Sequence, residues 1–158
     1  MATRYFCLDL GTETGYGIAK NGVVQDYDCL KLSKGTNEAY NQLYDWLQAN
    51  VSSTDIVVAE KPHAGQFFNA VRKLFGLLAV VELYCEQVGC SFHLVSPTSI
   101  KKFWAGSGKA GKPAMKAATL ERGIKINNHN TNDAVALLHY WHDLKGLRLI
   151  FPGAKDNT

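Results

Sequence analysis

The chain is poor in the residues that mark secreted, zinc-binding or membrane-spanning proteins. It has four cysteines among 158 residues, and their spacing matches no zinc site. Cysteines inside expected strands and an apolar helix are typical of buried thiols, which favours a reducing compartment. The longest apolar run, residues 74–83, is broken by Gly76 and Glu82 and is too short to span a bilayer. Because no signal peptide is visible at the start, we expect a cytoplasmic protein.

Charge is nearly balanced in total but is unevenly distributed. The net charge is +3 and the pI is about 8.6, values that are compatible with nucleic-acid binding but do not indicate it. Hydrophobic residues make up 46% of the chain, which excludes a disordered protein and predicts one domain over residues 1–151, followed by a flexible tail over residues 152–158. One stretch holds five lysines and no acidic residue: Lys101, Lys102, Lys109, Lys112 and Lys116.

Hydrophobic periodicity predicts an alternation of strands and helices. Strands are expected over residues 5–10, 16–19, 23–27, 54–60 and 91–96. Helices are expected over residues 37–50, 66–88, 97–104, 112–122 and 131–144. Asn21-Gly22 between two apolar runs is a strong hairpin signal. The order predicts an α/β fold with a five-stranded mixed sheet, three antiparallel strands and then parallel strands, flanked by helices.

Three acidic residues fall where such a fold gathers its functional groups. Asp9 and Glu60 end two strands that should be neighbours, and Asp133 opens the last helix. Ligand sites in open α/β sheets lie outside the carboxyl ends of the strands. Carboxylates that converge without enough basic partners repel one another, and Mg²⁺ or Mn²⁺ with oxygen ligands relieves that repulsion. We therefore expect these three acids to bind metal.

Each acid also has a simpler interpretation. Asp9 could accept hydrogen bonds from backbone N–H groups in the turn around Gly11, and Glu60 could be a solvated strand end beside Lys61. Asp133 could serve only to stabilise the positive end of a helix. The joint pattern of the three acids is more specific than any one of them.

Four segments resemble the RuvC-type Holliday junction resolvases, and among them the shorter phage-encoded members. The segments are CLDLGTETGYGIA, VVAEKP, VSPTSIKKFWAGSGKAGKPAMK and HNTNDAVALLHYW, which follow the family's order and cover most of the chain. The resemblance implies a ribonuclease H-like fold and a homodimer. It also implies metal-dependent cutting of four-way DNA junctions by two symmetric nicks, during DNA recombination and repair in a bacterial or phage-infected host cell.

The resemblance assigns roles to individual residues. Asp9, Glu60 and Asp133 match three metal-binding acids of the family. Lys112 and Lys101 match family lysines at the junction phosphates or in the active site. The implied site holds two Mg²⁺ or Mn²⁺ ions, which activate a water and stabilise the leaving oxygen, while a lysine, Lys112 first and Lys101 second, neutralises the developing charge.

The sequence departs from the family pattern at a fourth acid, one helical turn before the last one. Asn130 stands at that position, with His129 beside it. Either side chain can ligate a metal, although neutral ligands hold hard cations less tightly than carboxylates do. Either His129 or Asn130 substitutes for the acid, with a slight preference for His129, or the second ion is weakly held. The alternative for His129 is an ordinary loop residue in a polar run.

DNA contacts are expected from the lysine-rich stretch and from the aromatic residues that follow Glu60. Phosphate contacts by Lys101, Lys102, Lys109, Lys112 and Lys116 would give affinity without sequence preference. His63, Phe67 and Phe68 could stack on bases at an opened junction centre. The alternatives are a solvated lysine face and phenylalanines that belong to the core. Part of the apolar helix over residues 66–88 would form a twofold dimer interface.

Three other functions fit parts of the pattern. A YqgF-type RNA-processing nuclease shares the first acid–glycine motif, but the lysine-rich segment fits the junction resolvases better. A nucleotide-binding module of the actin, heat-shock ATPase and sugar-kinase type needs two domains, which 158 residues cannot supply. A catalytically silent protein that captures junctions stays open because the fourth acid is missing.

Overall fold

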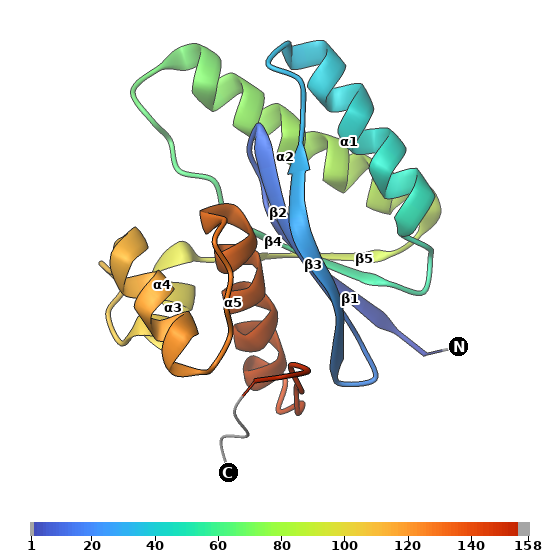
Figure 1. The fold of residues 1–158 in the computed structure, drawn as a ribbon. Helices are drawn as coiled ribbons and strands as arrows, with labels where there is room; N and C mark the ends of the chain where they lie inside the picture. Colours follow the sequence, from blue (N-terminus) through green and yellow to red (C-terminus); the bar gives the residue numbers. More distant parts are fainter. Residues whose placement is uncertain (1, 155–158) are drawn as a thin grey trace.

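The computed structural model describes residues 2–154, in which a single five-stranded sheet is covered by helices on both faces (Figure 1). The strands are β1 (Arg4–Asp9), β2 (Glu13–Lys20), β3 (Val23–Lys31), β4 (Ile56–Glu60) and β5 (Ser91–Val95). Their order is β3-β2-β1-β4-β5. β1, β2 and β3 are antiparallel neighbours, whereas β4 is parallel to both β1 and β5. The expected mixed sheet is confirmed.

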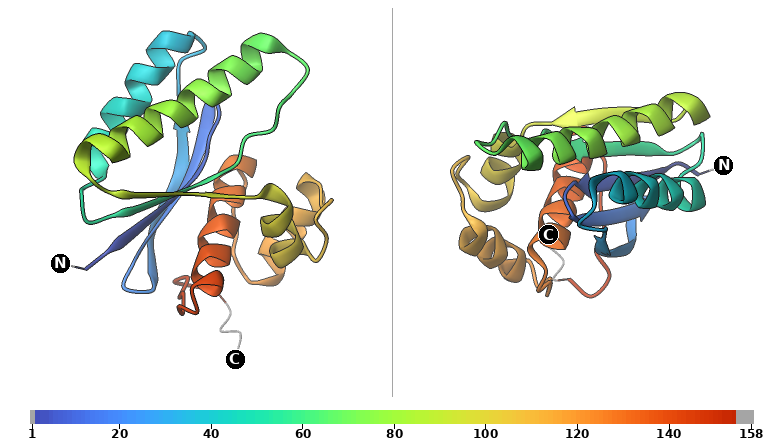
Figure 2. Two further views of the ribbon diagram at one scale, coloured as in Figure 1. Left: turned by 180° about the vertical axis from the view of Figure 1, so that it is seen from behind. Right: turned by 90° about the horizontal axis from the view of Figure 1, so that it is seen from above.

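The helices divide between the two faces of the sheet (Figures 1 and 2). They are α1 (Thr36–Asn50), α2 (Phe68–Val88), α3 (Pro97–Ala105), α4 (Lys112–Glu121) and α5 (His129–Leu144). Phe6 and Leu8 of β1 belong to the core under α1 and α2, and Cys7 belongs to the core under α3, α4 and α5. This alternation is the period of two of a strand with both faces buried.

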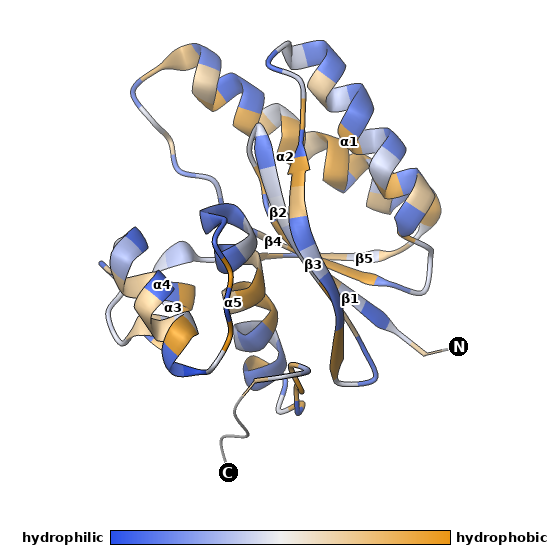
Figure 3. Cartoon of the chain, in the orientation of Figure 1, coloured by the Kyte–Doolittle hydropathy of each residue, from blue (hydrophilic) through white to orange (hydrophobic). Residues whose placement is uncertain are grey.

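Local sequence explains where the elements turn and begin. Asn21 (φ 53°) and Gly22 (φ 74°) both adopt the positive φ that a tight hairpin turn requires, which confirms the expected hairpin. The strands on either side are longer than predicted and reach Glu13 and Lys31. Hydrophilic residues interrupt the alternation of apolar and polar residues from which strands are predicted, so the outer parts of these strands were missed. The colouring of β3 shows such residues (Figure 3).

Two helices begin two residues away from their predicted starts. α2 begins at Phe68 rather than at residue 66, because the chain is still extended at Phe67. α5 begins at His129, two residues early, because the Asn128 side chain caps it and accepts hydrogen bonds from the N–H groups of Asn130 (2.9 Å) and Thr131 (3.0 Å). The interpretation of His129 as a loop residue is therefore wrong.

All four cysteines lie in the described residues and are free, and three of them are buried. Within residues 2–154, no helix combines the length and apolar character needed to cross a membrane.

Ala154 lies against the core, and its N–H donates to the Phe151 carbonyl at 3.0 Å. Residues 155–158 lie outside the described residues, so the flexible tail stays a prediction.

Candidate active site

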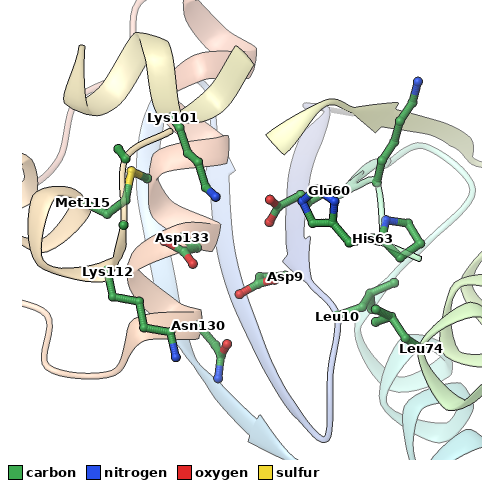
Figure 4. Close-up of a pocket in the computed structure, with 14 residues that line it drawn as sticks. Asp9, Leu10, Glu60, His63, Leu74, Lys101, Lys112, Met115, Asn130 and Asp133 are labelled. Carbon is green, nitrogen blue, oxygen red and sulfur yellow. The ribbon is translucent and has the colours of Figure 1, made fainter. Parts of the chain in front are cut away.

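A pocket of about 380 Å³ lies at the carboxyl ends of β1 and β4, and its wall contains the three predicted acids (Figure 4). Asp9 is the last residue of β1 and Glu60 the last residue of β4, its parallel neighbour. Asp133 reaches the same pocket from the second turn of α5. Parallel pairing and the packing of α5 across β1 and β2 thus bring together acids that are far apart in the sequence.

The turn after Asp9 is fixed by a buried hydroxyl. Thr14 is 1% exposed. Its Oγ1 donates to the Gly11 carbonyl at 2.7 Å and accepts from the Gly11 N–H at 3.3 Å. This closed turn sends the chain back as β2 and places Gly15 directly opposite Asp9 in the sheet.

The three carboxyl groups destabilise one another's charged forms. Burial raises the pKa of Asp9 well above its usual range, and the charges of Glu60 and Asp133 raise it further. Burial, followed by the charge of Asp133, raises the pKa of Glu60 to about 7. Burial also raises the pKa of Asp133, against the opposing effect of nearby positive charges. A site that makes three carboxylates costly to ionise gains stability from a bound cation.

Two of the five lysines lie in the pocket wall. Lys101 reaches it from α3 and Lys112 from the first turn of α4. In Figure 4 both side chains lie across the pocket from Asp9 and Glu60, on the side of Asp133. Lys101 lowers the pKa of Glu60 and Lys112 lowers that of Asp9, so each acts electrostatically on the acids. The other three lysines are exposed and lie outside the pocket wall: Lys102, Lys109 and Lys116.

Where the resemblance implies a fourth acid, the structure brings Asn130 and not His129 to the pocket. Asn130 lies in the wall and its amide is close to Lys112 in Figure 4. His129 is the exposed first residue of α5 and lies outside the wall. Its charge nevertheless lowers the pKa of Asp133.

The aromatic residues after Glu60 lie at the mouth of the site or beyond it. His63 lines the pocket, in the exposed loop that leads to α2. Phe67 and Phe68 are 76% and 77% exposed. The interpretation that either phenylalanine belongs to the core is wrong, because α2 turns its buried side to the sheet only further along, from Leu77 onward.

Sequence reasoning missed the apolar part of the pocket wall. Leu74 lies on one side and Met115 on the other (Figure 4), and Leu10, Pro62 and Ala110 also belong to the wall. No pattern in the sequence separates these residues from ordinary core residues, since only the fold brings them to the acids. They reduce the water around the carboxylates, which strengthens every charge interaction in the pocket.

The donor atoms of the pocket suit a hard divalent cation. Asp9, Glu60 and Asp133 supply carboxylate oxygens and Asn130 an amide oxygen, the ligand types preferred by Mg²⁺ and Mn²⁺. In the described part of the chain, no group of three or more His, Cys, Asp or Glu side chains is already arranged to hold a metal ion. Ion binding therefore requires these carboxylates to turn toward a common point.

No family model matches the chain, and no curated protein matches its sequence. Its fold matches solved structures, including two of RuvC. Thermus thermophilus RuvC is 19% identical with a TM-score of 0.69, and T. thermophilus RuvC in complex with Holliday junction substrate is 20% identical with a TM-score of 0.71. Each alignment covers 96% of this chain and 98% of the other. The fold is RuvC-like over nearly its whole length, and the expected ribonuclease H-like fold is confirmed.

Proposed function

We propose that this chain is a metal-dependent endonuclease that resolves four-way DNA junctions by symmetric hydrolysis of phosphodiesters. The observation that carries the proposal is the meeting of Asp9, Glu60 and Asp133 in one pocket with two lysines. The fold match to a RuvC structure in complex with Holliday junction substrate supports branched DNA as the substrate class. The sequence resemblance further supports a phage-encoded protein that acts in the cytoplasm of a bacterial or infected host cell.

The three acids would hold two Mg²⁺ or Mn²⁺ ions, with Asn130 in the place of the fourth acid. When bound, such ions activate a water and stabilise the leaving oxygen of an in-line displacement. The position of Asn130 in the pocket wall, with His129 outside it, favours Asn130 over His129 as the substitute. A neutral amide would hold its ion less tightly than a carboxylate, so we expect saturation to need more metal.

The lysines would divide between chemistry and DNA affinity. Lys112 and Lys101 lie in the pocket, where a positive charge stabilises the extra negative charge of the reacting phosphate. The exposed Lys102, Lys109 and Lys116 would contact phosphates away from the cleavage point.

The aromatic residues of the 61–67 loop and of the start of α2 would engage the junction centre. Phe67 and Phe68 expose most of their side chains. Such exposure has an energetic cost in water and is relieved when the rings stack on unpaired bases. His63 would add a further contact at the pocket mouth.

A homodimer would match the symmetry of the junction. α2 exposes the apolar side chains of Phe75 (45%) and Leu83 (55%). Exposed apolar side chains on a helix suit a twofold interface, in which the same surface of each copy is buried. Two active sites related by a twofold axis would then cut opposite strands of a four-way junction.

The test is a substrate panel in Mg²⁺ and in Mn²⁺. A labelled four-way junction, a linear DNA duplex and a structured RNA are incubated with the protein and with the Asp9→Asn variant. We expect cleavage of the junction alone, lost in the variant. Binding of an uncut junction in both metals would instead identify a catalytically silent junction-binding protein, and cleavage of RNA alone a YqgF-type nuclease.

A further inference from the structure

Gly15 lies at the point where the sheet touches the helix that carries Asp133. In the β1–β2 ladder Gly15 is the direct partner of Asp9. On its other side it lies against the first turn of α5. A Cβ atom at Gly15 would fall 1.9 Å from the carbonyl oxygen of Asn130 and 2.6 Å from the backbone nitrogen of Thr131. These distances are far below van der Waals contact.

The clash at Gly15 would be with backbone, so no change of side-chain rotamer can relieve it. The first turn of α5 is also held by the Asn128 cap, and its residues cannot move aside one at a time. Any side chain at position 15 must therefore push the start of α5 away from β2. Asn130 and Asp133 lie on the part of α5 that would move, and both line the pocket opposite Asp9 (Figure 4).

Gly17 provides the comparison. It also faces α5, two residues further along β2, but a Cβ there would meet the Leu138 side chain at 3.4 Å and the Ala134 carbonyl oxygen at 3.6 Å. Both are ordinary van der Waals distances. The backbones of β2 and α5 therefore approach too closely for a side chain at Gly15, which is paired with Asp9, but not at Gly17.

We propose that Gly15 is a positioning residue of the active site: the absence of its side chain sets the separation between Asp9 on β1 and Asn130 and Asp133 on α5. This inference rests on the proposed function, in which these residues hold divalent metal ions. Gly15 touches neither metal nor DNA and acts through the backbone of α5. Its substitution should therefore impair metal binding without impairing contact between the lysines and DNA.

The test compares Gly15→Ala with Gly17→Ala as a matched control. Mn²⁺ affinity is measured without DNA, by calorimetry or by the electron paramagnetic resonance signal of free Mn²⁺. Junction affinity is measured in EDTA, and folding by circular dichroism and thermal unfolding. We expect Gly15→Ala to bind Mn²⁺ about tenfold more weakly or worse, as supporting residues of metal sites do. Its junction affinity in EDTA should be unchanged, and Gly17→Ala should match the wild type in both.

A second variant guards against a Gly15→Ala protein that does not fold. Asn128→Ala removes the cap that holds the same first turn of α5, without placing an atom against β2. It should also weaken Mn²⁺ binding, by a smaller factor. If Gly15→Ala folds and binds Mn²⁺ as the wild type does, the positioning role is wrong. If Gly15→Ala does not fold, the same result for Asn128→Ala would overturn it. If the wild type itself binds no Mn²⁺, the proposed function fails, and this inference with it.

Discussion

At the scale of single residues, the site is a set of carboxyl groups held where their charges are costly. Glu60 shows this most clearly, because burial and the charge of Asp133 raise its pKa from 4.5 to about 7. In the unfolded chain its carboxyl ionises at the lower value. The folded, metal-free protein therefore loses stability from this group as pH rises from about 4.5 to about 7, and the loss is complete above that range.

Glu60→Gln should remove this pH dependence. We expect the metal-free variant to be more stable than the wild type at pH 8, by about 3 kcal/mol, and equally stable near pH 4. Urea unfolding at a series of pH values in EDTA measures the difference. Equal pH profiles for the two proteins would show that Glu60 ionises normally in the fold. The variant should also lose cleavage activity, so that stability is gained where function is lost.

Lys112 and Lys116 belong to the same helix but should behave differently. Both are exposed, but Lys112 lies in the pocket wall, whereas Lys116, one turn later, lies outside it. Lys112→Ala should lower the single-turnover cleavage rate by about 100-fold, the usual effect of removing a group that stabilises transition-state charge. Lys116→Ala should leave that rate unchanged. It should reduce the slope of the logarithm of junction affinity against the logarithm of salt concentration by about 1. The same loss of rate in both variants would place Lys112 among the general DNA contacts.

The three acids were within reach of sequence reasoning, because hydrophobic periodicity reveals the strands that end at Asp9 and Glu60 and the helix near whose start Asp133 lies. Their arrangement was not. Whether Asn130 or His129 faces the pocket depends on where α5 begins, and the Asn128 cap shifts that start by two residues. The exposure of Phe67 and Phe68 likewise depends on how far the preceding loop stays extended, which composition does not determine.

At the scale of elements, β3 is an edge strand, and several N–H groups on its outer side have hydrogen-bond partners. The Leu32 N–H donates inward to the Thr12 carbonyl at 2.7 Å. Because N–H directions alternate along a strand, those of Tyr27 and Cys29 point outward, away from β2. Each of these N–H groups donates to the side chain of the residue before it. The Tyr27 N–H donates to the Asp26 carboxylate at 2.9 Å, and the Cys29 N–H to the Asp28 carboxylate at 2.7 Å.

The beginning of β3 is covered by another part of the chain. The Val24 N–H donates to the Ile150 carbonyl at 2.9 Å, and the Ile150 N–H donates to the Gly22 carbonyl at 2.7 Å. Unpaired edges are templates for association, and charged side chains on them discourage it. Protection of this edge therefore explains why β3 carries Asp26 and Asp28.

Replacing both carboxylates should open this edge. We expect Asp26→Ala with Asp28→Ala to associate more strongly than the wild type as concentration rises, in sedimentation velocity. Amide exchange at Tyr27 and Cys29 should become slower at high concentration. A pair with the same loss of charge on exposed helix positions, Asp45→Asn with Asp143→Asn, is the control. Association equal to the wild type would mean that the carboxylates do not protect the edge.

At the scale of the whole molecule, the sheet separates a side that carries α1 and α2 from a side that carries α3, α4 and α5 (Figure 2). The acids lie at the carboxyl edge, with the lysine-bearing helices on one side of the pocket and the loop before α2 on the other. A DNA strand in the pocket would thus contact both sides. The mixed sheet behind this arrangement could be predicted from the order of strands and helices alone, since parallel strands need helical crossovers.

The exposed side of α2 should hold two copies together. Leu83→Asp introduces a charge into the apolar surface, and we expect it to shift a dimer toward the monomer in sedimentation measurements. Leu120→Asp on α4 is the control, because Leu120 is 49% exposed on another helix. The monomeric variant should make single nicks in a junction instead of paired ones. A dimer unaffected by Leu83→Asp would place the interface elsewhere.

The most direct measurement is to map the cut sites on a four-way junction with each strand labelled in turn. We predict that, in Mg²⁺ or Mn²⁺, the protein makes one nick at the same position in each of two opposite strands. Asp9→Asn should make none while still binding the junction. Cuts scattered over all four strands, or equal cutting of the arms as linear duplexes, would contradict the claim that this site resolves junctions.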